Sequence, residues 1–308
     1  MNPEYLVTHS GGFHADELCS TAVLSTLFPS AKIVRSRSKE WISASPDKII
    51  YDVGGVFDAS IHAYDHHQRG APLRKDGQPY SSFGLIWEHF GRAYLGTQNV
   101  PSDQIEIVHK SIDTSFVLPI DLLDNGAIDP SVADILSPLT LPNLLETLKP
   151  TFDSEKAEGE NLAFHEAVKV AKLFIEAQVS QAAAHLRAEN LVKLAIKESE
   201  GKHVLELPKG MPFWSAVNSA KAEHLLFVVH PRGQGDWALG GIRTTKDSFE
   251  LRANLPQEWG GLTNIDLERV SGVTGATFCH NGLFIAAATS RKAILAMAQI
   301  AVDNVLSK

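Results

Sequence analysis

The chain has 308 residues, of which 44% are apolar and 21% charged, and its net charge is −8. This length is sufficient for two domains with a core each, and the composition excludes a disordered chain. The acidic balance argues against a broad basic face that grips duplex nucleic acid through its phosphates.

Two features bear on the compartment. Cys19 and Cys279 are the only cysteines and form no CxxC pair, which fits a reducing compartment and disfavours zinc ribbons and disulfide scaffolds. Residues 1–10 lack a basic region followed by an apolar core, and no apolar run approaches the roughly 20 residues that span a bilayer. We therefore expect a soluble cytoplasmic protein without a membrane partner.

The first part of the chain alternates short apolar runs with helical segments. Tyr5–Thr8 predicts a strand, and the apolar spacing of residues 16–28 predicts a helix that ends at Pro29. This alternation is typical of a parallel α/β sheet whose functional groups gather at the carboxyl edge. Further strands are expected at Lys32–Arg35, Lys48–Val53 and Ile61–Tyr64.

Helical patterns dominate the middle of the chain. Ser81–Leu95 is amphipathic, and Ser102–Asn125 is expected to be kinked or broken at Pro119 and to stop at Gly126. Residues 128–150 contain four prolines and predict a linker or a lid-like excursion. Ser154–Ser199 then predicts a long helix that bridges two domains or packs in a homodimer.

The last third has a different pattern. Its strands, a hairpin turn at His280–Gly282 and a final helix Ser290–Leu306 capped by Ser290 predict a smaller α+β domain. We place the domains at residues 1–150 and 151–308, with the long helical region opening the second. The expected strands are His203–Leu207, Leu225–His230, Trp237–Thr245, Phe249–Asn254 and Ala276–Thr289.

Metal-competent side chains recur at the ends of successive predicted elements. Imidazole and carboxylate ligands together suit manganese, zinc, iron or cobalt, and a carboxylate between two cations can bridge them. Two such cations activate a water for attack on phosphorus. The candidates are His9, His14 and Asp16 after the first strand, Asp52 after the third, Asp65, His66 and His67 after the fourth, and Asp121 or Asp124 at a helix end.

Each candidate also has an ordinary explanation when taken alone. His9 is compatible with a surface turn, and Asp52 before two glycines with common turn chemistry. Asp16 can be a first-turn acid favoured by the helix dipole, and Asp124 part of a helix-ending turn. Their joint recurrence at element ends favours the metal-site interpretation.

Four motifs carry a resemblance to a known family. They are His9-Ser-Gly-Gly-Phe-His14-Ala-Asp16-Glu17, Tyr51-Asp52-Val-Gly-Gly55, Tyr64-Asp65-His66-His67-Gln-Arg-Gly70 and Asp121-Leu-Leu-Asp124-Asn-Gly126. The set resembles the MYG-one family, a branch of the DHH superfamily of metal-dependent phosphoesterases and exonucleases. Gly240-Gly-Ile-Arg243 and Phe278-Cys-His280-Asn-Gly-Leu-Phe284 extend the resemblance towards the end of the chain.

The resemblance implies a fold and a set of roles. It implies a parallel-sheet DHH-type N-terminal domain that holds two divalent metal ions, Mn²⁺ first, with Mg²⁺, Zn²⁺ and Co²⁺ as alternatives. Asp52 would bridge the ions, His67 would contact the scissile phosphate, and Asp65 would orient an imidazole. Asp121 competes with Asp124, which we favour because it lies nearer the helix end. The implied ligands are His9, His14, Asp16, Asp52, His66 and Asp124.

The second domain resembles the family's substrate-binding domain. Guanidinium groups match phosphate oxygens, although each arginine could equally be ion-paired on the surface. His280 is favoured because it precedes a glycine-containing turn. The candidate substrate contacts are Arg232, Arg243, Arg252, His280 and Arg291.

The function that the resemblance implies is a metal-dependent phosphodiester hydrolase. A 3′–5′ exoribonuclease or oligonucleotidase acting on RNA or short oligonucleotides is expected first. A small-molecule phosphatase or pyrophosphatase on the same metal site is one alternative, and a non-catalytic metal-binding regulatory protein is another.

Overall fold

The computed structural model describes residues 2–154, 158–233 and 235–307. The chain divides into two compact units, residues 1–183 and 184–308, and each is described by itself. The division falls inside the helix α7 (Glu158–Glu198). The predicted domain boundary at residue 150 lies before this helix and stays a prediction.

Unit 1 is built on a five-stranded sheet with the order β2-β1-β3-β5-β4. Four strands are parallel, as the alternating pattern predicts, but the edge strand β4 pairs antiparallel with β5. The four predicted strands are thus parallel as expected, and the antiparallel edge strand β4 was not predicted. The strands are β1 (Tyr5–Thr8), β2 (Lys32–Arg35), β3 (Lys48–Tyr51), β4 (Phe57–Asp58) and β5 (Ala63–Tyr64).

The strand that leads to the Asp-His-His run is shorter than Ile61–Tyr64. A 3₁₀ turn at Ala59–Ile61 precedes it, and the Asp58 side chain caps this turn by accepting a hydrogen bond from the Ser60 backbone N–H. His62 has a left-handed backbone with φ of 57°, which ends the turn before the strand begins.

A buried helix lies at the centre of unit 1. In α1 (Ala15–Leu27), ten consecutive residues from Ala15 to Leu24 are buried, and they include the polar side chains Asp16, Glu17, Ser20 and Thr21 as well as small and apolar ones. Helix α3 (Ser82–Thr97) packs against it. The other helical segments of unit 1 are α2 (Lys39–Ile42), α4 (Ile105–Ile112), a π-helical turn (Asp113–Val117), α5 (Leu118–Asp124), a 3₁₀ segment (Pro130–Leu139) and α6 (Leu141–Glu146).

The predicted break near Pro119 takes a different form. The irregular turn is a π-helical segment over residues 113–117, and Pro119 follows directly in the first turn of α5. Gly126, with φ of 64°, ends the helical region as expected.

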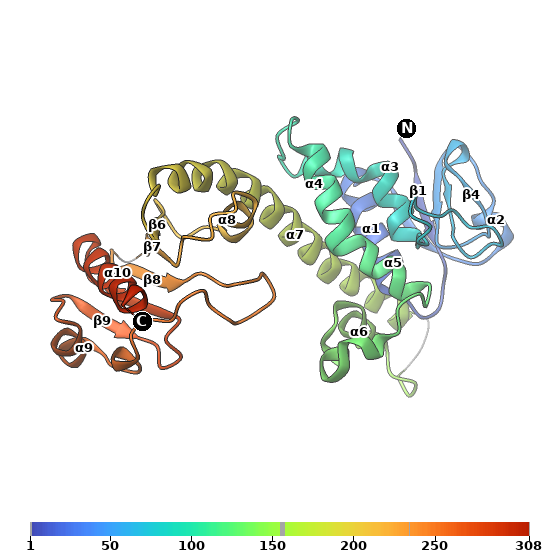
Figure 1. Cartoon of the computed structure of the whole chain (residues 1–308). Coiled ribbons are helices and arrows are strands. Elements are labelled where there is room, and N and C mark those ends of the chain that lie inside the picture. Colours follow the sequence, from blue (N-terminus) through green and yellow to red (C-terminus); the bar gives the residue numbers. More distant parts are fainter. Residues whose placement is uncertain (1, 155–157, 234, 308) are drawn as a thin grey trace. The chain divides into compact units, whose positions relative to one another are not determined.

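Unit 2 contains a second five-stranded sheet with the order β6-β7-β8-β10-β9. Only β6 and β7 run parallel, and α10 covers one face (Figure 1). The expected strand at residues 249–254 is absent, since only an isolated bridge joins Arg243 to Leu251. The elements are β6 (Val204–Glu206), α8 (Trp214–Ser219), β7 (Phe227–Pro231), β8 (Trp237–Gly241), a 3₁₀ turn (Gln257–Trp259), α9 (Asn264–Ser271), β9 (Ala276–Cys279), β10 (Ile285–Ala288) and α10 (Arg291–Leu306).

Two local predictions in unit 2 are confirmed. The Ser290 hydroxyl accepts a hydrogen bond from the Ala293 backbone N–H and caps α10. The strands β9 and β10 form an antiparallel pair joined through residues 280–284. Among the described residues, no helix combines the length and apolarity needed to cross a membrane.

Two glycines of α3 test the packing of α3 against α5 in unit 1. A Cβ on Gly84 would lie 2.0 Å from Asp121 Oδ2 and 2.7 Å from Tyr80 Cδ1, whereas a Cβ on Gly96 would meet no atom within 4 Å. We expect Gly84→Ala to lower the free energy of unfolding by about 2–4 kcal/mol and Gly96→Ala to raise it by up to about 1 kcal/mol. Urea titration followed by circular dichroism measures both, and equal effects would contradict the described contact between α3 and α5.

Candidate metal centre

The loops that follow three parallel strands meet at one edge of the unit 1 sheet. His9 follows β1, Asp52 follows β3, and Asp65 to His67 follow β5. The parallel arrangement brings these carboxyl ends together, and the end of α5 adds Asp124. The structure therefore assembles side chains that lie up to 115 residues apart in the sequence, from His9 to Asp124.

The first loop is organised by the start of α1. Both carboxylate oxygens of Glu17 accept the backbone N–H of His14, at 2.9 and 2.8 Å, which caps the helix. One of these oxygens also lies 3.2 Å from His9 Nε2. Asp16 is buried, and its Oδ2 accepts a hydrogen bond from the Ser82 hydroxyl at 2.7 Å. The helix start thus fixes Glu17 beside the His9 ring, and Ser82 fixes Asp16.

Asp52 lies between two imidazoles. Its Oδ2 is 3.2 Å from His9 Nε2, and its Oδ1 is 3.2 Å from His66 Nε2. The residue has a left-handed backbone with φ of 59°, which is strained for a side chain other than glycine. Gly54, with φ of 104°, completes the sharp turn after β3. The turn places both carboxylate oxygens among the other ligand candidates.

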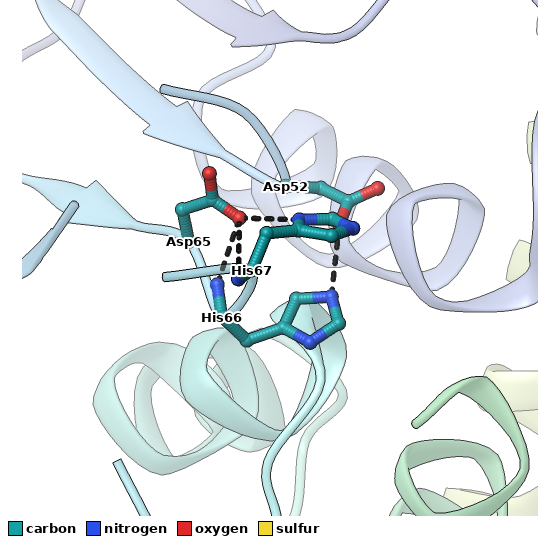
Figure 2. Close-up of side chains that lie close together, drawn as sticks. All are labelled: Asp52, Asp65, His66 and His67. Atoms are coloured by element: carbon teal, nitrogen blue, oxygen red, sulfur yellow. Dashed lines mark hydrogen bonds and ion pairs between the residues drawn. The ribbon is translucent and has the colours of Figure 1, made fainter. Parts of the chain in front are cut away.

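Asp65 holds the Asp-His-His run in place (Figure 2). Its Oδ1 accepts the backbone N–H of His66 at 2.8 Å and lies 2.7 Å from His67 Nδ1, while Oδ2 accepts the Gly55 N–H. The His66 side chain is 5% exposed and that of His67 is 61% exposed. Adjacent histidines therefore have different environments, one inside the cluster and one at its surface.

The two candidate aspartates of α5 have different surroundings. Asp124 Oδ2 lies 3.3 Å from His66 Nε2. Asp121 is fully buried, and its oxygens are taken by the Ser81 hydroxyl, the Gly84 N–H and the Arg74 guanidinium, at 2.6, 2.9 and 2.6 Å. Among the described residues, Asp121 belongs to no histidine–carboxylate group close enough to share a cation. Asp124 therefore lies within the cluster, whereas both oxygens of Asp121 are engaged by partners outside it.

Negative charge is concentrated in this site. Burial raises the pKa of Asp16, and the nearby charge of Asp52 adds to the rise. Burial and the neighbouring Asp16 raise the pKa of Asp124 to about 9. Burial alone would raise the pKa of Asp52 too, but hydrogen bonds from His66 and His9 lower it to about 2. Protons thus compensate a charge that divalent cations could compensate instead.

The pKa values of the histidines reflect the same concentration of negative charge. Burial alone would lower the pKa of His9, but its hydrogen bonds to Asp52 and Glu17 raise it to about 10. For His66 burial is likewise outweighed, chiefly by the hydrogen bond to Asp52, and the pKa rises to about 9. The hydrogen bond to Asp65 raises the pKa of His67.

The residues present fit a divalent cation. Asp16 Oδ1 is buried and has no hydrogen-bond partner among the described residues, an arrangement that is costly unless a cation binds there. Imidazole nitrogens with carboxylate oxygens are a suitable ligand set for Mn²⁺, Zn²⁺ or Co²⁺. In the part of the chain that the structure describes, four overlapping groups have ligand atoms within 4.8 Å of one another: Asp52 with Asp65, His66 and His67; His9 with His14 and Glu17; His14 with Asp16 and Asp124; and Asp16 with Glu17 and Asp52.

A cavity of about 840 Å³ opens onto the cluster, within the size range of small-ligand sites. Its wall includes Pro142, Asn143 and Glu146 from α6, so the proline-rich segment forms part of the site. Among the described residues that line it, Arg37 is the only arginine or lysine, and it donates to the Ser10 carbonyl at 3.3 Å. The cavity therefore has an acidic floor with Arg37 in its wall.

Sequence reasoning missed two residues of the site. Glu17 looks like an ordinary first-turn acid, but the structure shows it in contact with His9 as well. Arg37 was not singled out, although its position after β2, at the carboxyl edge of the sheet, was a usable signal. Arg37 lines the cavity, and Glu17 supports it by contacting His9.

The substrate-contact candidates of unit 2 are mostly engaged within that unit. Arg291 forms a two-pronged ion pair with Glu206, Arg232 pairs with Asp236, and Arg252 donates to the carbonyls of Ala222 and Leu225. Arg243 and His280 are exposed. Arg243 has no ion pair in the described part of unit 2 and its guanidinium lies near the Phe249 ring, whereas His280 Nδ1 accepts the Gly282 backbone N–H.

Comparisons with known proteins give consistent results along the chain. The MYG1_exonuc family model, described as Uncharacterised protein family (UPF0160), matches residues 5–302. The human and mouse proteins named MYG1 exonuclease are 31% and 30% identical; each alignment covers 97% of this chain, and 86% and 85% of the respective relative. The MYG1 protein YER156C of Saccharomyces cerevisiae is 29% identical over 96% of this chain and 94% of its own length. No solved structure gives a significant match.

Crowding of the carboxylates predicts an unusual stability effect. We expect Asp124→Asn to raise the free energy of unfolding in EDTA by about 1–3 kcal/mol, because a carboxyl group whose pKa is raised by folding destabilises the fold at neutral pH. The same variant should lose most of the thermal stabilisation that Mn²⁺ gives the wild type.

The exposed Asp103 supplies the matched control. Asp103→Asn should behave like the wild type both in EDTA and with Mn²⁺, as read by differential scanning fluorimetry. If Asp124→Asn destabilises the metal-free protein, or leaves the Mn²⁺ response unchanged, the described crowding does not govern this site.

Proposed function

The chain belongs to the MYG1 exonuclease family, and from this premise we propose that it is a metal-dependent phosphodiester hydrolase that removes nucleotides from the 3′ end of RNA or short oligonucleotides. Unit 1 is then a DHH-type catalytic domain. The names of the human and mouse relatives, MYG1 exonuclease, support a nuclease activity.

One observation carries the proposal: a buried carboxylate–imidazole cluster lies at the bottom of a cavity. Asp52 and His66 lie within it, and His67 is exposed at its surface (Figure 2). A volume of about 840 Å³ suits the end of a single strand better than a duplex, which favours removal of terminal nucleotides.

The residues in this cluster divide into ligands and supports. His9, His14, Asp16, His66 and Asp124 would hold two divalent cations, with Asp52 between them because each of its oxygens faces a different imidazole. When bound, the ions would supply a water of lowered pKa and offset the charge of the phosphate. Glu17 fixes the His9 ring, and Ser82 fixes Asp16. Manganese is our first choice, with Mg²⁺, Zn²⁺ and Co²⁺ as alternatives.

His67 is the residue that we assign to the substrate. Its Nδ1 lies 2.7 Å from an Asp65 oxygen that also accepts two backbone N–H groups. These bonds keep Asp65 ionised, and its pKa is lowered because they outweigh the effect of burial. Asp65 thereby holds the proton on Nδ1 of His67 and orients the ring. The exposed side chain can then donate a proton to the leaving oxygen or stabilise the phosphate charge.

The test is hydrolysis of 3′-labelled single-stranded RNA by the full chain with Mn²⁺. We expect His67→Ala to lower the rate by about 10²–10⁴-fold while Mn²⁺ binding stays near the wild-type value, because the ring acts on the substrate. Asp52→Asn should lose both activity and most Mn²⁺ binding. Gel analysis of the products and a metal-binding titration measure the two effects separately.

The exposed His165 of α7 provides the control, since His165→Ala removes an imidazole far from the cluster in sequence. Its activity should equal that of the wild type. If wild type hydrolyses neither RNA, DNA nor dinucleotides with Mn²⁺, Mg²⁺, Zn²⁺ or Co²⁺, the nuclease proposal fails. Release of phosphate from pyrophosphate in the same series would instead indicate the small-molecule alternative.

A further inference from the structure

The hairpin of β9 and β10 in unit 2 displays three aromatic rings on its surface. Phe278 is 37% exposed and Phe284 45% exposed, and His280 between them is exposed as well. The His280 ring centroid lies 4.3 Å from that of Phe284 and 6.3 Å from that of Phe278. The rings form one contiguous group, the hairpin cluster, defined by Phe278, His280 and Phe284.

The buried part of the hairpin is formed by other residues, so core packing does not explain why three aromatic rings stand at its surface. Cys279, Ala286 and Ala287 are at most 1% exposed and supply the buried part of the two strands. A register shift between Ala287 and Ala288 inserts one extra residue beside Phe278. Such bulges re-aim a side chain, and here the largest side chains of the hairpin are those left at the surface.

The backbone holds the ring pair in place. Leu283 has a left-handed conformation with φ of 59°, which is unfavourable for leucine and turns the chain directly before Phe284. The Gly282 N–H donates to His280 Nδ1 at 2.9 Å, so a neutral His280 carries its proton on Nε2. A Cβ at Gly282 would lie 3.2 Å from both rings, which favours glycine at this position.

A cation without an ion-pair partner among the described residues follows the strand that pairs with the hairpin. The Gly241 N–H donates to the Phe284 carbonyl at 3.0 Å, and Arg243 follows two residues later. Arg243 has no ion pair among the described residues, and its guanidinium lies 5.1 Å from the ring centroid of Phe249, which is 89% exposed. The Arg243 guanidinium and the exposed Phe249 ring thus lie in the segment that follows the strand paired with the hairpin.

We propose that the hairpin cluster is a base-stacking platform for single-stranded nucleic acid, with Arg243 contacting an adjoining phosphate. The proposal rests on the proposed function, which makes a single strand the substrate. Every base presents a flat π face, so exposed aromatic rings bind successive bases with little sequence preference. Arginine adds a planar donor group for the phosphate between them. The hairpin cluster binds the strand and takes no part in the hydrolysis itself.

The test separates binding from chemistry. Fluorescence anisotropy of labelled oligoadenylate is measured with the full chain in EDTA, where metal-dependent hydrolysis cannot occur. We expect Phe284→Ala and His280→Ala each to weaken binding about tenfold. Phe284→Trp should restore binding to the wild-type level or better, whereas Phe284→Leu should bind as weakly as the alanine variant. Apolar contact alone predicts no loss with leucine.

Phe152 is fully exposed in unit 1, and Phe152→Ala is the matched control that should bind like the wild type. Thermal unfolding of every variant shows whether the fold is retained. If Phe284→Ala unfolds, the comparison of Phe284→Leu with Phe284→Trp decides the outcome. Wild-type affinity in Phe284→Leu and His280→Ala would overturn the platform, as would absence of binding by the wild type. Binding through these rings without hydrolysis under any metal would overturn the proposed function alone.

Discussion

The structure of unit 1 depends on the compensation of negative charge at one edge of its sheet. Asp16, Glu17 and Asp52 are buried, and Asp124 joins them through His66. Buried carboxylates repel one another strongly because the surrounding medium screens them little. Without metal, His9 and His66 supply compensating hydrogen-bond donors, and protons supply the rest. Such an arrangement is costly for a purely structural site and suits one that exchanges protons for cations.

The scaffold explains how this charge is held in place. Glu17 caps the buried helix α1 and contacts His9, so the helix start and the first ligand loop are fixed by a single side chain. Asp52 reaches its position through a left-handed backbone after β3. Strained residues of this kind persist where the surrounding structure determines them strongly, and they concentrate at functional sites. The position of the cluster thus follows from strand ends and one helix start.

Sequence patterns were sufficient to predict that His9, Asp52 and His66 converge, because the ends of parallel strands share one edge. They could not decide between Asp121 and Asp124, since the partner that engages Asp121 is Arg74, 47 residues away in the sequence. For the same reason the Arg291–Glu206 pair, 85 residues apart, was not foreseeable. Strand β4 has two residues and carries no periodic signal, so its antiparallel pairing was not predictable either.

The central claim is that Asp52 and its neighbours hold a pair of cations, and the magnetic coupling between two Mn²⁺ ions tests it most directly. Electron paramagnetic resonance of the full chain, titrated with Mn²⁺, should show the signal of isolated ions replaced by an exchange-coupled spectrum as the second equivalent binds. Asp52→Asn should lose this coupled spectrum. A wild-type titration that ends with one uncoupled ion per chain, or with no bound Mn²⁺, would contradict the account.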